Sequence, residues 1–229
     1  MGVKKRDIQR RWWRIAIGNI VIALIVAMVS TKTDTFGDAQ DCRDWASVDA
    51  LIPPVSFYQF DSSEWNTLDA VVFELDPNLS DEAYRIVSNE DGVKVYHGKE
   101  GDHRAQSTLG QLGMLGSEVA LPWGEIKDEP VFGHRGVLMD VCRHFFTVDE
   151  VKRHLDVMAL YKFNVLHWHL TEDQGWRIAM DKYPKLAEVA AYRMHGDSAY
   201  GGSYSREDLE EVVNYAAGYG IEVIPEIEL

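Results

Sequence analysis

Short apolar runs alternate with amphipathic segments in the carboxyl-terminal part of the chain. Residues 136–141 (GVLMDV), 164–170 (NVLHWHL) and 221–229 (IEVIPEIEL) have the nearly continuous apolar character of buried strands. Between them, residues 147–150 (TVDE) form a capping box that opens a helix, and a second capped helix is expected over residues 205–220. This alternation predicts parallel strands, buried on both sides by the helices.

The region before residue 124 has shorter β-type runs and one helical segment. A helix is expected to begin at Asp102, its N-cap, and to place Ala105, Leu109 and Leu112 on one face. The charged segment GEIKDEP, residues 124–130, is typical of a linker. Residues 51–127 are therefore predicted to form a small α+β domain. Its expected strands are residues 55–60, 70–75, 84–88 and 93–96, the last two joined by the hairpin signal NEDG.

The first thirty residues resemble a membrane-targeting segment. Residues 15–29 contain no charge, and they follow a basic head made of Lys4, Lys5, Arg6, Arg10, Arg11 and Arg14. The apolar run is long for a cleaved signal peptide and slightly short for a retained anchor, so both alternatives stay open for residues 1–30. Residues 12–30 would contact the membrane if uncleaved. We therefore expect an exported protein, periplasmic, extracellular or lumenal, with residues 31–50 as a polar linker.

The remainder of the chain is strongly acidic. Residues 31–229 carry 17 Lys and Arg side chains against 36 Asp and Glu side chains. Such a surface repels phosphate backbones, so nucleic acid is not expected as a partner. The two cysteines, Cys42 and Cys142, cannot define a disulfide framework, and we expect two free thiols.

Polar side chains gather at the carboxyl ends of the three expected strands in the second half of the chain. The loops after parallel strands converge on one face of a sheet, and burial of such groups without a role is costly, so a polar pocket is predicted there. The groups are Asp140, Cys142, Arg143 and His144 after the first strand, His167, His169, Glu172 and Asp173 on or after the second, and Glu226 and Glu228 on the third.

The two histidines of the second strand allow more than one interpretation. His167 and His169 are two residues apart and point to the same side of a strand, an arrangement that suits a zinc pair. No further histidine ligands are visible around them, and core histidines that orient their neighbours are favoured, so no metal and no other cofactor is expected. Trp168 points to the opposite side and is expected in the core. Trp176 is either a pocket wall or packs on the following helix.

Several segments together resemble glycoside hydrolase family 20, the β-N-acetylhexosaminidases. They are GHRGVLMDVCRHFF, HLDVMALYKFNVLHWHLTEDQGWRI, KYPKLAEVAAYR and GGSYSREDLEEVVNYAAGYGIEVIPEIEL, within a resemblance that is continuous over residues 134–229. Residues 51–125 look, more loosely, like the small α+β domain that precedes the catalytic barrel in that family. The resemblance implies that residues 131–229 form the first three strand–helix units of a (β/α)8 TIM barrel.

The resemblance also implies an activity and roles for individual residues. Members of this family remove terminal N-acetylglucosamine or N-acetylgalactosamine from glycans with retention of configuration, and the acetamido oxygen of the substrate attacks the anomeric carbon. Arg143 matches the arginine that grips the ring hydroxyls. Glu172 matches a carboxylate of the supporting network, where better-known members have Asp, and Asp173, His169 and Glu228 are expected to belong to that network.

The catalytic Asp-Glu pair of the family is expected beyond Leu229. We therefore expect a truncated sequence that is inactive by itself. Two other functions remain as alternatives, a metal-dependent barrel hydrolase that uses His167 and His169, and a non-catalytic, membrane-tethered carbohydrate-binding fragment. The sequence does not indicate an oligomeric state.

Overall fold

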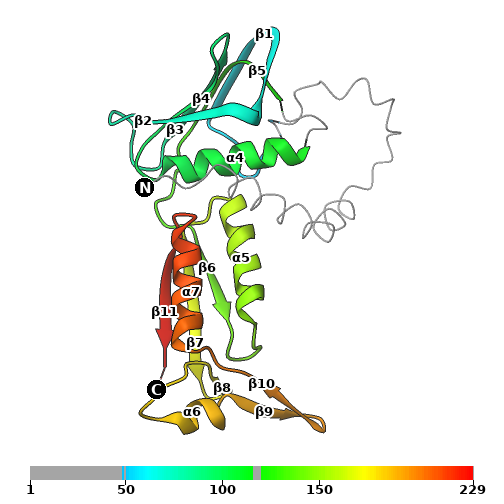
Figure 1. Cartoon of the computed structure of the whole chain (residues 1–229), viewed down its shortest axis with the longest axis vertical. Helices are drawn as coiled ribbons and strands as arrows, with labels where there is room; N and C mark the ends of the chain where they lie inside the picture. Colours follow the sequence, from blue (N-terminus) through cyan, green and yellow to red (C-terminus); the bar gives the residue numbers. More distant parts are fainter. Residues whose placement is uncertain (1–47, 49, 116–119, 229) are drawn as a thin grey trace, which may run out of the picture. The chain divides into compact units, whose positions relative to one another are not determined.

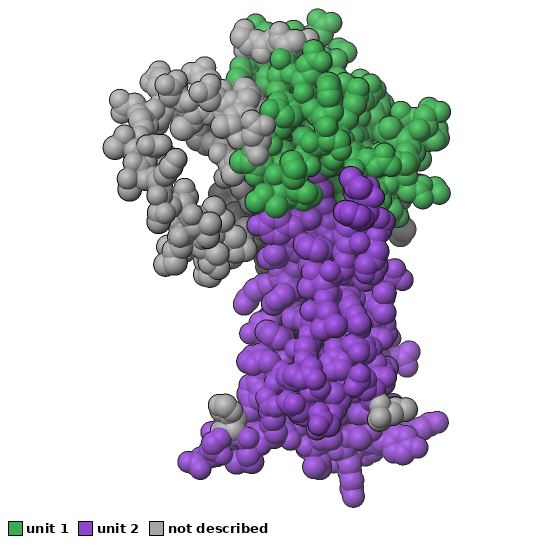
Figure 2. All heavy atoms as spheres, turned by 180° about the vertical axis from the view of Figure 1, so that it is seen from behind, with its two compact units in different colours: residues 1–129 green, residues 130–229 purple. Residues whose placement is uncertain are grey.

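The computed structural model describes residues 48, 50–115 and 120–228. The chain divides into two compact units, Met1–Glu129 and Pro130–Leu229 (Figure 2). Residues 1–30, predicted as a signal peptide or anchor, lie outside the described residues, as do Cys42 and nearly all of the expected linker. Among the described residues, no helix is both long enough and apolar enough to cross a membrane.

The first unit is a five-stranded sheet with one long helix (Figure 1). The strand order is β1-β5-β3-β4-β2. The predicted helical face is confirmed, because Ala105 and Leu112 are buried and Leu109 packs against the same core. The helix begins at Gly101, so Asp102 lies in its first turn and is not its N-cap. The elements are β1 (Phe57–Thr67), η1 (Leu68–Ala70), β2 (Val71–Leu75), β3 (Tyr84–Asn89), β4 (Gly92–His97), α4 (Gly101–Leu115) and β5 (Ala120–Asp128).

The linker predicted for residues 124–130 is wrong over most of its length. Residues up to Asp128 belong to β5, which lies between β1 and β3 in the sheet. Ile126 and Asp128 face the interior, and the Asp128 carboxylate accepts hydrogen bonds from the hydroxyls of Tyr84 at 3.0 Å and Ser56 at 2.9 Å. The charged composition therefore reflects the outer face of a strand, where Glu125 pairs with Arg85.

The second unit is mixed α/β and contains the three predicted parallel strands. Their order is β6, β7, β11, and both pairings are parallel, as predicted (Figure 1). The elements are β6 (Gly136–Asp140), α5 (Val148–Leu160), β7 (Val165–Glu172), β8 (Gly175–Trp176), α6 (Pro184–Glu188), β9 (Tyr192–His195), β10 (Ser198–Gly201), α7 (Arg206–Ala217) and β11 (Glu222–Ile227).

Both long helices of this unit begin at a capping box. Thr147 accepts a hydrogen bond from the backbone N–H of Glu150, whose side chain accepts one from the Thr147 N–H, which confirms the predicted signal. Ser205 and Asp208 form the same reciprocal pair at the start of α7. These bonds satisfy backbone donors that the first turn of a helix leaves free, and they fix where each helix starts.

The helices cover one face of the three strands, and the expectation of burial on both faces is wrong for the described residues. Trp168 of β7 packs in a core with Leu155 of α5 and Val212 of α7, as predicted for this tryptophan. On the other face, Leu138 of β6 and Ile224 of β11 are exposed. Strand side chains alternate between faces, so this open face also carries His167 and His169.

Candidate functional site

Three polar residues lie side by side at the carboxyl ends of the parallel strands. The strand register pairs Asp140 of β6 with His169 of β7, and His169 with Glu226 of β11. Neighbouring strands are about 4.8 Å apart, so side chains in register on one face come within reach of each other. The convergence predicted from the strand ends is therefore present in the structure.

Arg143 lies in the loop after β6 and contacts two carboxylates. One terminal nitrogen of its guanidinium is 2.5 Å from Asp140 Oδ2, and the other is 2.7 Å from Glu172 Oε2. The Arg143 side chain nevertheless remains 60% exposed. The hydrogen bond to Asp140 raises the pKa of Arg143, the charge of Glu172 adds to this, and the exposed Asp173 makes the smallest contribution. The guanidinium is thus held in place and open to solvent.

Asp140 fixes the loop that carries Arg143. Its Oδ1 accepts hydrogen bonds from the backbone N–H groups of Cys142, at 2.9 Å, and Arg143, at 3.0 Å. Burial by itself would raise the pKa of Asp140, but the hydrogen bonds from Arg143 and Cys142 outweigh it and lower the pKa below its ordinary value. Asp140 therefore stays ionised at neutral pH and keeps the guanidinium bound.

Glu172 ends β7 and is nearly inaccessible to solvent. Its side chain is only 5% exposed, and within the described part of the chain its buried Oε1 has no hydrogen-bond partner. Oε2 is 2.7 Å from Arg143 and 3.7 Å from His169 Nε2. The position predicted for a supporting carboxylate is therefore occupied by a buried group that lies between an arginine and a histidine.

Glu226 joins the two histidines of β7. Its Oε2 is 2.8 Å from His167 Nε2 and 2.9 Å from His169 Nδ1. Within the described part of the chain Glu226 Oε2 has no hydrogen-bond partner, so both are close contacts between a histidine ring and a carboxylate without hydrogen-bond geometry. The sequence placed Glu226 on the pocket face but gave it no role, whereas the structure makes it a direct partner of both histidines.

Glu228 and Thr171 connect β11 to β7 just beyond this cluster. The Thr171 hydroxyl donates to the Glu228 carbonyl at 2.9 Å and accepts from the Glu228 N–H at 2.8 Å. Among the described residues, a ring nitrogen of His169 and one carboxylate oxygen each from Glu226 and Glu228 all lie within 4.8 Å of one another. A cation would find nitrogen and carboxylate ligands of a type that zinc accepts in this group.

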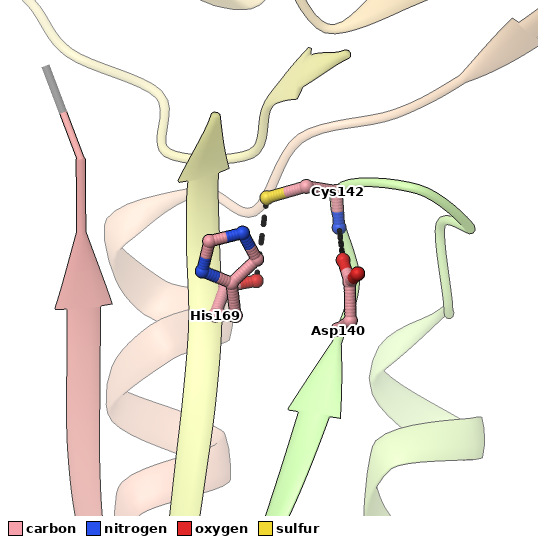
Figure 3. Close-up of side chains that lie close together, drawn as sticks. All are labelled: Asp140, Cys142 and His169. Carbon is pink, nitrogen blue, oxygen red and sulfur yellow. Dashed lines mark hydrogen bonds between the residues drawn. The ribbon is translucent and has the colours of Figure 1, made fainter. Parts of the chain in front are cut away.

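A second group of metal-ligating types lies at the end of β6, as Figure 3 shows. Asp140, Cys142 and His169 form it, and Cys142 Sγ donates to the His169 carbonyl at 3.3 Å. Burial raises the pKa of the Cys142 thiol to about 12, with further contributions from the charges of Asp140 and Glu172. Without a metal the thiol is therefore protonated at neutral pH, and a metal that bound there would have to displace this proton. Cys142 is free and buried, as predicted.

Arg177, which the sequence did not single out, organises the backbone beneath the site. Its side chain is fully buried, and burial lowers its pKa from the ordinary arginine value. A Cβ on Gly175 would lie 2.6 Å from the Arg177 guanidinium carbon, so that glycine is needed for the close approach. Arg177 donates to the carbonyls of Val141 at 2.8 Å, Cys142 at 2.6 Å, Gly202 at 3.1 Å and Ala191.

The hairpin of β9 and β10, which the sequence did not predict, is also fastened to the Arg143 loop. Arg193 of β9 donates to the Arg143 carbonyl at 2.5 Å and to Gln174 at 3.1 Å. The exposed His144 ring contacts Tyr200 of β10, with centroids 5.4 Å apart. Together with Arg177, these contacts hold the loop after β6 from several sides.

The model of the glycosyl hydrolase family 20 catalytic domain matches residues 132–229. Residues 132–229 belong to glycosyl hydrolase family 20. A beta-hexosaminidase of Porphyromonas gingivalis is 46% identical over 164 residues, covering 66% of this chain and 21% of the relative. A beta-hexosaminidase of Akkermansia muciniphila is 38% identical over 186 residues, covering 79% and 38%.

Solved structures of family 20 enzymes resemble the same chain. A beta-N-acetylhexosaminidase matches with a TM-score of 0.72 and 38% identity, over 79% of this chain and 40% of that one. The family 20 exo beta-N-acetylglucosaminidase of Vibrio harveyi, solved in complex with N-acetylglucosamine, matches with a TM-score of 0.70 and 26% identity, over 86% and 38%. The chain thus spans well under half the length of the relatives it matches.

Proposed function

We propose that this chain supplies the sugar-recognition side of a retaining β-N-acetylhexosaminidase active site. The observation that carries the proposal is the Arg143 guanidinium, held between Asp140 and Glu172 at the carboxyl ends of parallel strands. Membership of family 20 and the beta-hexosaminidase relatives support a glycosidase activity on terminal N-acetylglucosamine or N-acetylgalactosamine.

The geometry of Arg143 suits a neutral, hydroxyl-rich ligand. A guanidinium has five N–H donors, and the two carboxylates engage one donor on each terminal nitrogen. The two carboxylates also balance the positive charge, so that the remaining donors can face hydroxyl groups that bring no charge of their own. Asp140 and Glu172 therefore orient the guanidinium of Arg143. Its remaining N–H donors are proposed to bind neighbouring hydroxyls of the terminal sugar.

The three parallel strands are proposed to be the first strands of a (β/α)8 barrel. Two features support this: the helices cover only one face of the strands, and the side chains of Leu138 and Ile224 on the other face are exposed. In such barrels the strand ends that carry Arg143 and Glu172 form the rim of the active site. The basic and apolar composition of residues 1–30 supports export, with extracytoplasmic glycans as substrates.

The proposed reaction uses the substrate's own acetamido group. Its oxygen attacks the anomeric carbon while a carboxylic acid protonates the leaving oxygen, and water later opens the cyclic intermediate with retention. Arg143 is proposed to bind the sugar. Glu172 and Glu226 contact Arg143 and His167, respectively, and support the binding site. The proposal therefore assigns sugar recognition to this chain and gives none of these three residues a proton to transfer.

The test is a substrate comparison with the full-length protein expressed from its gene. We expect it to release the chromophore from aryl N-acetyl-β-glucosaminide and N-acetyl-β-galactosaminide. The matched control is the aryl β-glucoside, which has a hydroxyl in place of the acetamido group and should be cleaved poorly, because its nucleophile is missing. Cleavage of the glucoside at a similar rate, or no cleavage of either N-acetylated substrate, would contradict the proposed function.

A further inference from the structure

Arg193 of β9 bridges the two segments that carry Arg143 and its carboxylate partner. One terminal nitrogen of Arg193 donates to the Arg143 carbonyl, in the loop after β6, at 2.5 Å. The other donates to Gln174 Oε1, in the turn after β7, at 3.1 Å. Gln174 is two residues from Glu172, the carboxylate that contacts the Arg143 guanidinium. One side chain thus connects the backbone of Arg143 to the segment that holds its ion-pair partner.

Both backbone polar groups of Arg143 are hydrogen-bonded. Its N–H donates to Asp140 Oδ1 at 3.0 Å, and its carbonyl accepts from Arg193. Because peptide units are planar, these two bonds fix the planes on either side of the Arg143 Cα and the direction in which the side chain leaves the main chain. Asp140 and Glu172 hold the far end of that side chain. Holding both ends of a side chain with many rotamers lowers the entropy that sugar binding would otherwise cost.

The β9–β10 hairpin holds Arg193 in this position. Arg193 pairs in register with Tyr200 of β10, and its guanidinium carbon lies 5.9 Å from the centre of the Tyr200 ring. The Tyr200 hydroxyl donates to the Phe145 carbonyl at 3.3 Å, and the Tyr200 ring contacts the ring of His144. The hairpin therefore contacts three consecutive residues of the loop after β6, residues 143–145.

Arg193 differs from Arg177, which binds the same loop. Arg177 is fully buried and donates to the carbonyls of Val141 and Cys142, at the start of the loop. Arg193 is exposed and donates to the carbonyl of Arg143 itself. Replacing an exposed side chain usually changes the stability of a domain little. The effect of Arg193 on ligand binding can therefore be measured separately from its effect on folding.

We propose that Arg193 is a positioning residue for sugar binding. It ties the loop of Arg143 to the turn of Gln174 and thereby keeps the Arg143 guanidinium beside Glu172. The proposal rests on the proposed sugar-binding role of Arg143, through which Arg193 acts without contacting the substrate. Arg193 therefore affects the affinity for the sugar and leaves the chemical step to other groups.

The kinetic test uses the full-length protein with Arg193→Met, which removes both donors. With aryl N-acetyl-β-glucosaminide, we expect KM to rise about three- to tenfold, as for the loss of one or two hydrogen bonds, and kcat to change by less than about twofold. Arg193→Lys keeps the charge but cannot reach two acceptors with separate nitrogens, so it should restore only part of the affinity. Arg206→Met is the matched control, at an exposed arginine that pairs with Glu210 of its own helix, and should preserve KM.

Two further measurements separate positioning from other effects. In the Arg143→Lys enzyme, the additional change Arg193→Met should raise KM by less than about twofold, because the guanidinium that Arg193 positions is already missing. Chemical denaturation of the full-length protein should give nearly the same free energy of unfolding for Arg193→Met as for the unaltered protein.

The proposal would be overturned if Arg193→Met left KM unchanged while Arg143→Lys impaired binding. It would also be overturned if the two substitutions raised KM independently of each other, or if Arg193→Met destabilised the unit as much as removal of the buried Arg177 guanidinium. An Arg143→Lys enzyme with unchanged kcat/KM would instead reject the proposed function.

Discussion

Replacing Arg177 with methionine should lower the free energy of unfolding of the unit formed by residues 130–229 by about 3–5 kcal/mol. Methionine fills a similar length but has no donor, so the carbonyls of Val141, Cys142, Gly202 and Ala191 would lose the guanidinium as a donor, and Ala191 would keep the Gly202 N–H. A loss of this size is a large fraction of the stability of an ordinary domain. Hydrogen exchange at the amides of β7, measured in the full-length protein, reports the change locally.

Arg206→Met is the matched control for this experiment. Arg206 is exposed at the start of α7 and pairs with Glu210 one turn away, so its replacement should change the free energy of unfolding by no more than about 0.5 kcal/mol. If Arg177→Met were as mild as this control, the buried guanidinium would not hold the loops after β6 and before β9 as described.

Replacing Arg143 with lysine should lower kcat/KM for an aryl N-acetyl-β-glucosaminide by about 10- to 100-fold, because hydrogen bonds to a charged group contribute about 1.5–3 kcal/mol. Lysine keeps the charge but cannot contact Asp140 and Glu172 with two separate nitrogens while it presents further donors to a sugar. Since the side chain is 60% exposed, its replacement should leave the free energy of unfolding nearly unchanged. Steady-state kinetics and chemical denaturation of the full-length protein measure the two quantities.

Arg206→Lys serves as the matched control for the kinetic effect. It makes the same chemical change at an exposed arginine of the same unit, whose ion pair is with Glu210 of its own helix. We expect its kcat/KM to equal that of the unaltered protein. An Arg143→Lys enzyme with unchanged kcat/KM would remove the role assigned to the guanidinium fork.

Local signals with a strong physical basis predicted much of the second unit. The capping boxes at Thr147 and Ser205 fixed two helix starts, and the apolar runs around Trp168 gave strands that pair in parallel. These signals act within a few residues or follow from burial of a whole strand. They therefore survive in the folded protein largely as the sequence presents them.

Elements whose stability comes from distant partners were not predictable in this way. The charged residues of β5 have the composition of a linker. The sequence pattern does not reveal that Glu125 forms an ion pair with Arg85 on the neighbouring strand β3. The β9–β10 hairpin follows α6 closely, and contacts far along the chain, such as that of Arg193 with the Arg143 loop, fasten it. Tertiary partners outweigh local composition at both places.

The candidate site likewise contains residues that the strand pattern placed and residues whose contacts depend on distant partners. Arg143 and Glu172 could be placed together from the strand ends alone, and their guanidinium and carboxylate are 2.7 Å apart in the structure. The contacts of Glu226 with both histidines depend on the register of β11 against β7, which the sequence does not specify. Arg177 looks like a surface residue by type, and only the adjacent GW pair hinted at a tightly packed position.

The most direct test of the sugar-recognition claim is a structure of the full-length protein with N-acetylglucosamine bound. We expect the Arg143 guanidinium to lie within about 3 Å of one or two ring hydroxyls of the sugar. It should keep its contacts with Asp140 and Glu172. A sugar bound elsewhere, or bound with its hydroxyls out of reach of Arg143, would contradict the account.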